Sequence, residues 1–253
     1  MPADEPYRAF AKVYDRVMSD VPYDEWVDYL VGIFRRFRIR PQDILEIACG
    51  TGNVLVPLAQ RGYHVAGLDR SADMLAVCRA KIEKADLRIP LWQQDMRTMS
   101  LPETFDVILC LYDSINYVLE ADELSAVFQR VREHLRPGGY FIFDMNSSHR
   151  LAKIPNDTIV IDEPGFFLCW ENNYDGVTRI WSITLNGFVE DENNPGVWHR
   201  FHELHQERGY PHRLVLDLLR KAGLVSRAEF TAFTFLPVTR HAGRIYYVAQ
   251  RPV

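Results

Sequence analysis

The chain has 253 residues, of which 47% are hydrophobic and 25% charged, a balance typical of a globular protein with a large core. Its formal net charge of -5 excludes a general electrostatic attraction to a phosphate backbone or an anionic membrane, so nucleic acid is a disfavoured substrate. The first ten residues lack the features of a signal peptide, and no apolar run reaches the roughly 18 residues of a membrane span. We therefore expect a soluble, cytoplasmic protein with no membrane association.

Apolar side chains at spacings of three and four predict two helices before the core, over residues 7–19 and 22–38. Strands and helices then alternate. The expected strands are 43–49, 63–69, 88–93, 105–111 and 140–144, and the helices between them are 53–60, 71–84 with Ser71 as N-cap, and 121–135. This alternation predicts an α/β fold with a parallel, doubly wound sheet.

The alternation stops after Asn146, where short β-rich runs fill residues 158–207. Turn signals separate these runs at Asp175-Gly176, Asn186-Gly187 and 193–196, which indicates an inserted antiparallel β-sheet. A helix over 211–222 and two strands over 224–235 and 244–251 complete the chain. We therefore expect one domain built from 1–149 and 208–253, with an inserted substrate or lid region at 150–207.

A ligand site is indicated at the end of the first core strand. The segment 46–52 (EIACGTG) joins that strand to a helix, and its glycines allow a tight turn and a close approach of a ligand. The second strand ends in Asp69, which is placed to accept hydrogen bonds from the ribose hydroxyls of a nucleoside. A dinucleotide fingerprint needs a third glycine at position 55, where this chain has Leu55, so NAD is disfavoured.

These motifs resemble those of class I S-adenosylmethionine (SAM)-dependent methyltransferases. The likeness covers residues 43–147 and rests on EIACGTG, LD at the second strand end, QQDM and CLYDSINY, in that order. The segment RIYYVAQRP resembles the antiparallel seventh strand of this family, which implies a seven-stranded, mostly parallel, Rossmann-like sheet. The segments YDRVMSD and YDSINY are most similar to a YqeM-like branch, with glycine and amino-sugar N-methyltransferases as more distant relatives.

The resemblance implies a set of cofactor contacts for SAM and its product S-adenosylhomocysteine (SAH). In the family, the loop under the methionine part corresponds to Glu46, Ala48, Cys49, Gly50 and Gly52, Asp69 to the ribose contact, and Arg70, Met74, Asp95 and Met96 to the adenine contacts. Leu111 and an N-terminal aromatic, Tyr14, complete the set. Ala48 departs from the family pattern, which has glycine there. Asp95 as a simple loop residue and Tyr14 as helix packing remain open alternatives.

The acceptor side is less defined. The candidate catalytic groups are Tyr112, Asp113 and His205, and the candidate substrate contacts are Asn116, Tyr117, Trp170, Arg208 and Tyr210. Asp113 and Asn116 are alternatively turn caps. We expect no metal, because a strand would put His202 on the face opposite His199 and His205, no carboxylate cluster is evident, and the four cysteines form no CxxC pair.

We therefore expect a SAM-dependent methyltransferase that acts on a small-molecule amine or hydroxyl. The aromatic-rich insertion suits a lid or a homodimer interface, and its acidic residues favour a cationic acceptor. Three alternatives stay open at this point: an RNA methyltransferase, which would need a basic surface beside the cofactor crevice; a non-catalytic SAM-binding regulatory protein; and an enzyme that transfers a modified methyl group.

Overall fold

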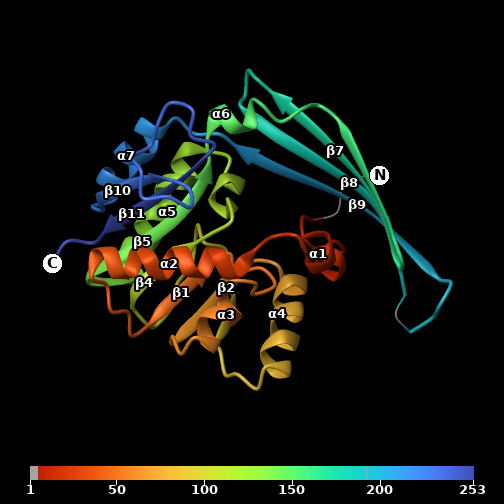
Figure 1. Cartoon of the computed structure of the whole chain (residues 1–253), viewed down its shortest axis with the longest axis horizontal. Helices are drawn as coiled ribbons and strands as arrows, with labels where there is room; N and C mark the ends of the chain where they lie inside the picture. Colours follow the sequence, from red (N-terminus) through yellow and green to blue (C-terminus); the bar gives the residue numbers. More distant parts are fainter. Residues whose placement is uncertain (1–4, 192) are drawn as a thin grey trace.

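The computed structural model describes residues 5–191 and 193–253, which form two β-sheets (Figure 1). The larger sheet has the strand order β10-β11-β5-β4-β1-β2-β3, and its strands are parallel except for β11, which is antiparallel to β5 and β10. Its strands are β1 (Ile44–Ile47), β2 (Val65–Asp69), β3 (Leu91–Gln93), β4 (Phe105–Cys110), β5 (Leu135–Asn146), β10 (Val225–Thr231) and β11 (Arg244–Gln250). The predicted doubly wound, mostly parallel seven-stranded sheet is confirmed.

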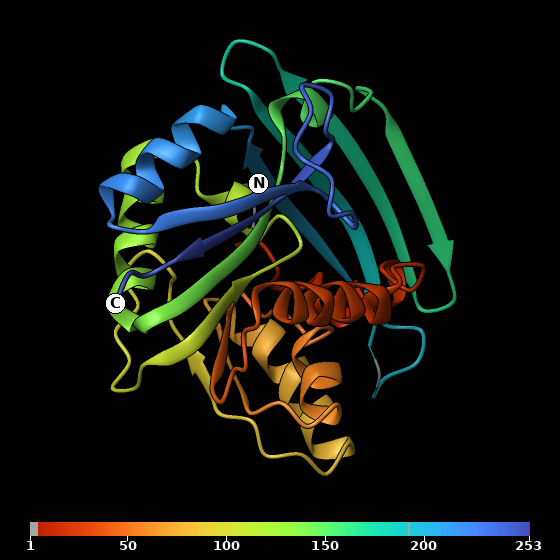
Figure 2. The same ribbon diagram turned by 60° about the vertical axis from the view of Figure 1, so that its left-hand side comes forward.

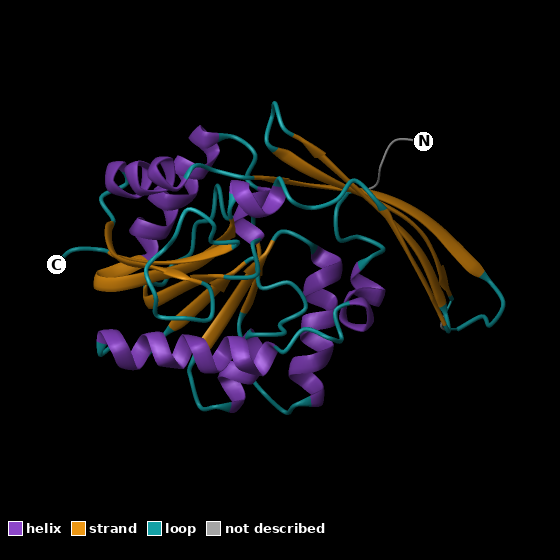
Figure 3. Cartoon of the chain, turned by 45° about the horizontal axis from the view of Figure 1, so that its top comes forward, coloured by secondary structure: helices purple, strands orange, loops and turns teal. Residues whose placement is uncertain are grey.

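Helices cover both faces of this sheet (Figure 3). The helices α2 (Tyr23–Phe37), α3 (Leu55–Gln60) and α4 (Ala72–Lys84) pack on one face, and α5 (Ala121–His134) and α7 (His212–Lys221) pack on the other. All residues of β1 and β2 are consequently buried, which explains why these strands are apolar except for Glu46 and Asp69. The predicted cap is present, since the Ser71 hydroxyl accepts a hydrogen bond from the Met74 backbone N–H.

The second sheet is the inserted one, and it projects away from the larger sheet (Figure 1). It is an antiparallel sheet of β6 (Thr158–Glu163), β7 (Phe166–Asp175), β8 (Ile180–Glu190) and β9 (Trp198–Arg208), reached from β5 through the short helix α6 (Ser148–Leu151). The Asp175-Gly176 turn signal falls between β7 and β8, as predicted.

The turn predicted at Asn186-Gly187 is wrong. Both residues lie inside the continuous strand β8, where Gly187 is paired with Leu168 on β7 and with Phe201 on β9. A Cβ atom on Gly187 would lie 2.5 Å from the Phe201 ring. This glycine therefore leaves room for a neighbouring aromatic side chain within the sheet, and strand pairing overrides the local turn signal.

The N-terminal segment joins the two sheets (Figure 2). The helix α1 (Ala11–Val17) and the residue before it contribute Phe10 and Val13 to a small core with the inner face of the inserted sheet, including Phe166, Leu168 and Ile183. The predicted N-terminal helix thus forms a wall between the larger sheet and the insertion. Within the described residues, no helix is both long and apolar enough to cross a bilayer.

Candidate functional site

The turn after β1 lies where the strand order of the larger sheet reverses, which is the usual ligand position in such sheets. Three of its residues have positive φ: Ala48 and Gly50 at 54° and Gly52 at 80°. A Cβ on Gly52 would lie 2.6 Å from the Cys78 sulfur on α4, so glycine there lets the turn pack against that helix. The other residues of the turn, Ala48 to Thr51, line an open space.

Asp69, at the end of β2, borders this space and holds two loops together. Its carboxylate accepts hydrogen bonds from the backbone N–H groups of Gly50 and Ser71, both at 2.8 Å. Burial raises the pKa of Asp69, and these hydrogen bonds oppose that effect. The side chain is thus fixed at the mouth of the crevice between β1 and β2.

A cavity of about 990 Å³, which includes space open to solvent, follows the carboxyl ends of these strands. Of the predicted cofactor contacts, those that line it are Tyr14, Glu46, Ala48, Cys49, Gly50, Asp69, Arg70, Met74, Asp95, Met96 and Leu111. Gly52 is outside the lining because it packs against α4. The sequence interpretation did not include Tyr7, Tyr23 and Asn53, which also line this cavity.

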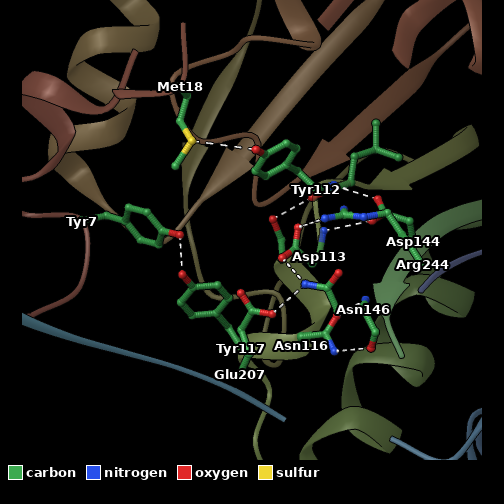
Figure 4. A network of polar contacts seen from close by, with 12 residues as sticks. Tyr7, Met18, Tyr112, Asp113, Asn116, Tyr117, Asp144, Asn146, Glu207 and Arg244 are labelled. Carbon is green, nitrogen blue, oxygen red and sulfur yellow. Dashed lines mark hydrogen bonds and ion pairs between the residues drawn. The ribbon is translucent and has the colours of Figure 1, made fainter. Parts of the chain in front are cut away.

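The turn after β4 is strained and contributes Tyr112 to the lining of this cavity; Figure 4 shows Tyr112 and Asp113 with their polar contacts. Tyr112 and Asp113 both have positive φ, 58° and 52°, although neither is glycine. The Asp144 carboxylate holds this turn by accepting both of their backbone N–H groups, at 2.7 and 3.1 Å. Arg244 pairs with Asp113 at 2.9 Å and with Asp144, and its guanidinium lies over the rings of Trp26 and Tyr112.

A second cavity, of about 790 Å³ including space open to solvent, is lined by both sheets and α1. It contains the predicted residues Asp113, Trp170 and His205. Four tyrosines line both cavities: Tyr7, Tyr14, Tyr112 and Tyr117. The two cavities are therefore neighbours that share an aromatic boundary.

Comparison with known proteins identifies the family. A model of a methyltransferase domain matches residues 44–139. The chain is 30% identical over 255 residues to a protein of Geobacillus sp. (strain WCH70) described as an inferred methyltransferase, covering 97% of this chain and 99% of that protein. The chain belongs to the SAM-dependent methyltransferases. YqeM of Bacillus subtilis (strain 168), also an inferred methyltransferase, is 29% identical to this methyltransferase over 97% of each chain, which confirms the predicted YqeM-like branch.

A solved structure agrees with this assignment. A SAM-dependent methyltransferase from Clostridium acetobutylicum ATCC 824 is 30% identical to this methyltransferase, with a TM-score of 0.84 over 98% of this chain and 99% of that one. An N,N-dimethyltransferase of Streptomyces fradiae, named for dTDP-3-amino-3,6-dideoxy-alpha-D-glucopyranose, is 35% identical over 53% of this chain and 52% of its own. The cofactor of this methyltransferase is SAM.

The first cavity suits the charge of SAM. Glu46 is 4% exposed, and its Oε2 atom has no hydrogen-bond partner among the described residues. Burial raises the pKa of this carboxyl well above its ordinary value, followed by smaller effects of Cys78 and Asp69. A buried acceptor without a partner is costly, so a cationic group such as the α-ammonium of SAM would stabilise it. The cavity and this group therefore fit each other.

We expect Ala48→Gly to stabilise this methyltransferase. Relief of the left-handed backbone at Ala48, about 1–2 kcal/mol, outweighs the extra entropy of an unfolded glycine, about 0.4–1 kcal/mol. The free energy of unfolding in urea should therefore rise by roughly 0.5–1 kcal/mol, and calorimetry should show SAH affinity at least equal to that of the parent protein. A fall in either quantity would show that the Ala48 methyl group contributes packing.

A chain of hydrogen bonds crosses the boundary between the cavities. The Tyr7 and Tyr117 hydroxyls lie 2.5 Å apart, Tyr117 lies 3.2 Å from His205 Nδ1, and His205 Nε2 lies 3.0 Å from Glu203. With the Glu203 carboxylate accepting, a neutral imidazole accepts at Nδ1 from Tyr117, which in turn accepts from Tyr7. The chain can therefore draw a proton from the Tyr7 position toward His205.

Glu203 also anchors the N-terminal segment. Its carboxylate accepts the backbone N–H groups of Tyr7 and Ala9 at 2.8 Å and of Phe10 at 3.0 Å. Burial raises the pKa of Glu203, but the His205 hydrogen bond and these N–H groups outweigh burial, so the net pKa is lowered. Strand β9 thereby holds Tyr7 at the site.

We expect Glu203→Gln to lower the free energy of unfolding by about 2–4 kcal/mol near neutral pH, because a neutral amide matches these donors less well. Because the pKa of Glu203 is lowered in the folded state, its carboxylate stabilises the folded protein at pH values above the ordinary pKa of 4.5. This contribution is lost as pH falls through the folded-state pKa. The deficit measured by urea unfolding should therefore shrink in acid. The exposed Glu171→Gln is the matched control, and a pH-independent deficit would contradict the assignment.

Three predicted substrate contacts lie outside both cavities. Asn116 is fully buried and its amide donates to the backbone carbonyls of Asn146 and Arg208. Arg208 forms an ion pair with Glu120 at 3.4 Å, and the Tyr210 hydroxyl donates to the carbonyl of Val118. These side chains satisfy backbone and surface partners and so organise the loops behind the site.

Within residues 5–191 and 193–253, no group of three or more His, Cys, Asp or Glu side chains is placed to hold a metal ion. Continuous strand β9 puts His202 on the face opposite His199 and His205, as the sequence predicts. The second cavity contains residues that the sequence interpretation missed, notably Asn146, Glu207 and Arg244. The sequence could have indicated Glu207, because it lies two residues after His205 in a strand and therefore on the same, inward face.

Proposed function

We propose that this methyltransferase transfers the methyl group of SAM to a small-molecule amine or hydroxyl bound in the second cavity. The observation that carries the proposal is the shared boundary of Tyr7, Tyr14, Tyr112 and Tyr117, which brings a donor cavity and an acceptor cavity together. The lining of the second cavity is mostly aromatic and apolar with a few polar and charged groups, which is typical of a site for a molecule of small size. The Streptomyces fradiae relative, named for an amino-sugar acceptor, supports this size class.

In this proposal the donor lies along the first cavity. Glu46 pairs with the α-ammonium group, Asp69 binds the ribose hydroxyls, and Asp95 accepts from the adenine amino group. The remaining donor contacts are Tyr14, Ala48, Cys49, Gly50, Arg70, Met74, Met96 and Leu111. Arg97 pairs with Asp95 at 2.7 Å and keeps that carboxylate ionised, since its hydrogen bonds outweigh burial and lower the Asp95 pKa.

SAM, when bound, supplies a methyl group activated by a sulfonium. The protein then mainly has to position the acceptor in line with that group and exclude water. Tyr112 and Tyr117 would hold the acceptor at the boundary, and Trp170 would cover it from the inserted sheet. Tyr7, backed by Tyr117 and His205, is placed to accept a proton from a hydroxyl acceptor.

Residues 150–207 are, in this proposal, the acceptor lid, because the inward face of their sheet lines the second cavity through Trp170, Trp181 and Ile183. The outward face carries exposed Val160, Phe188 and Leu204. We propose that this outward face mediates a homodimer. Sedimentation of the protein as a monomer at micromolar concentration would contradict it.

The test is a screen of small amines, amino acids and sugars for SAH release from SAM. We expect release with at least one acceptor, and calorimetric binding of SAH without any acceptor. Trp170→Ala should reduce turnover while leaving SAH affinity unchanged, because Trp170 lines only the second cavity. Met74→Ala should weaken SAH binding instead. If the protein binds SAH but releases no SAH from SAM with any acceptor in the screen, the small-molecule proposal is refuted.

A further inference from the structure

Two acidic side chains lie together in the acceptor cavity (Figure 4). Asp113, in the turn after β4, is 7% exposed, and Glu207, on β9 of the inserted sheet, is 3% exposed. One amide group connects them: Asn146 Nδ2 donates to Asp113 Oδ2 at 2.6 Å and to Glu207 Oε2 at 3.1 Å. Both side chains line the second cavity. We call Asp113 and Glu207 the carboxyl pair.

Positive charge is scarce around the carboxyl pair. The Arg244 guanidinium forms ion pairs with both Asp113 and Asp144. It therefore already faces two carboxylates, and Glu207 is a third acidic group nearby. No Lys, Arg or His among the described residues forms an ion pair with Glu207, and Arg150, which also lines the cavity, is exposed. With Glu207 ionised, three carboxylates would surround one guanidinium, and a buried network with two more negative than positive charges is unfavourable without a further cation.

The proton on Glu207 follows from this imbalance. Burial raises the pKa of Glu207 well above its ordinary value, and the charge of Asp113 adds to that effect. Burial and the charge of Asp113 therefore both favour the protonated form of Glu207. Where like charges lie close together, one shared proton is favoured over two ionised carboxyl groups.

A second observation indicates that a ligand completes this region. The Asn146 Oδ1 atom is buried and has no hydrogen-bond partner among the described residues, yet Asn146 lines the cavity. A buried carbonyl oxygen of this kind is stabilised by a donor. The same cavity carries the aromatic rings of Tyr7, Tyr117 and Trp170, and aromatic rings attract cations. The donor that fits all three features is an ammonium group.

We propose that the carboxyl pair is the specificity site of the acceptor and recognises a protonated amine. This inference rests on the proposed function and names its substrate class. The ammonium group pairs with Asp113 and Glu207, donates to Asn146 Oδ1, and displaces the shared proton from Glu207 to solvent. Before methyl transfer, an ammonium N–H bond breaks and an O–H bond forms on Glu207. The freed nitrogen lone pair then bonds to the methyl carbon while the carbon–sulfur electrons go to sulfur, which yields neutral SAH and a methylated ammonium.

The first experiment compares amines with alcohols of the same skeleton, using ethanolamine with ethylene glycol, tyramine with tyrosol, and glucosamine with glucose. Methyl transfer from radiolabelled SAM should be observed with amines and not with the paired alcohols. Glu207→Gln should lower kcat/KM for an amine about 100-fold, mainly through KM, because a neutral amide loses the charge pairing. Its SAH affinity should equal that of the parent protein.

Two variants control this comparison. Glu163→Gln changes an exposed carboxylate at the end of β6 and should behave as the parent protein. Glu207→Asp keeps the charge and should recover part of the lost amine activity. If Glu207→Gln keeps the amine preference, or if the parent protein methylates alcohols as well as amines, the proposed role of the carboxyl pair in amine recognition is refuted. The proposed function would still stand. If the protein binds SAH but transfers no methyl group to any of these amines or alcohols, the result counts against the proposed function itself.

The second experiment needs no turnover. A protonated carboxyl group has a carbonyl stretch distinct from that of a carboxylate, so infrared spectra of the SAH complex at neutral pH should show a band that Glu207→Gln lacks. Saturation with ethanolamine should remove this band from the parent protein, because the ammonium displaces the proton. A parent spectrum without the band, or a band that is unchanged by ethanolamine and glucosamine, would overturn the inference.

Discussion

Replacing Arg244 by glutamine should lower the free energy of unfolding by about 3–5 kcal/mol near neutral pH, because it leaves buried carboxylates without their cation. Arg244 is the pairing partner of both Asp113 and Asp144, and Asp144 is fully buried. Urea unfolding monitored by tryptophan fluorescence measures the loss. The exposed Arg227→Gln, which removes a contact to Gln250, is the matched control and should cost well under 1 kcal/mol.

The deficit of Arg244→Gln should depend on pH. Burial raises the pKa of Asp144 from 3.8 to about 6 in the folded protein, and Arg244 opposes that rise. When the pKa of a carboxyl group is raised in the folded state, the free energy of unfolding decreases as pH increases through that pKa. Without Arg244, the pKa of Asp144 rises further. The deficit should therefore be smaller at about pH 5, where Asp144 is protonated, than at about pH 7.5. An equal deficit at both values would show that Arg244 acts through packing on Trp26 alone.

Replacing Asp69 by alanine should weaken SAH binding by at least about 100-fold in calorimetry, since two hydrogen bonds from ribose to a charged group contribute about 1.5–3 kcal/mol each. The same change releases the Gly50 and Ser71 N–H groups, so a loss of affinity alone does not separate ribose binding from loop order. Comparison of SAH with its dideoxyribose analogue makes that separation.

If Asp69 binds the sugar, the parent protein should prefer SAH over the dideoxyribose analogue, and Asp69→Ala should bind both equally. Asp73→Ala, an exposed acid in the first turn of α4, is the control and should keep the parent preference. Retention of the preference by Asp69→Ala would remove the ribose assignment and leave Asp69 as a loop anchor.

The sequence predicted the parts of this protein that depend on local pattern. Mostly apolar runs identified buried strands such as β1 and β2. A turn next to an acidic strand end identified the donor cavity around Gly50 and Asp69. These features are encoded within short segments. Where a local signal competed with a long-range contact, as at Asn186-Gly187, the contact with Phe201 prevailed.

The acceptor side was less predictable because its residues meet only through tertiary folding. Asp144, Glu207 and Arg244 lie far apart in the sequence, with no spacing that connects them, yet they surround the Tyr112–Asp113 turn. Asn116 and Tyr210 were predicted to contact the acceptor, but the direction of each side chain depends on which carbonyl needs a donor. Position along a loop does not reveal such needs.

The contact of Glu203 with Tyr7 spans 196 residues and has a consequence for the order of folding. During synthesis the ribosome delivers Tyr7 long before strand β9 exists, so the wall between the two cavities cannot close until Glu203, 196 residues later, has emerged. Contacts of such long range form late and slow the folding reaction. A nascent chain that ends before Glu203 would therefore present a donor crevice without its N-terminal wall, and methyl transfer would wait for the last inserted strand.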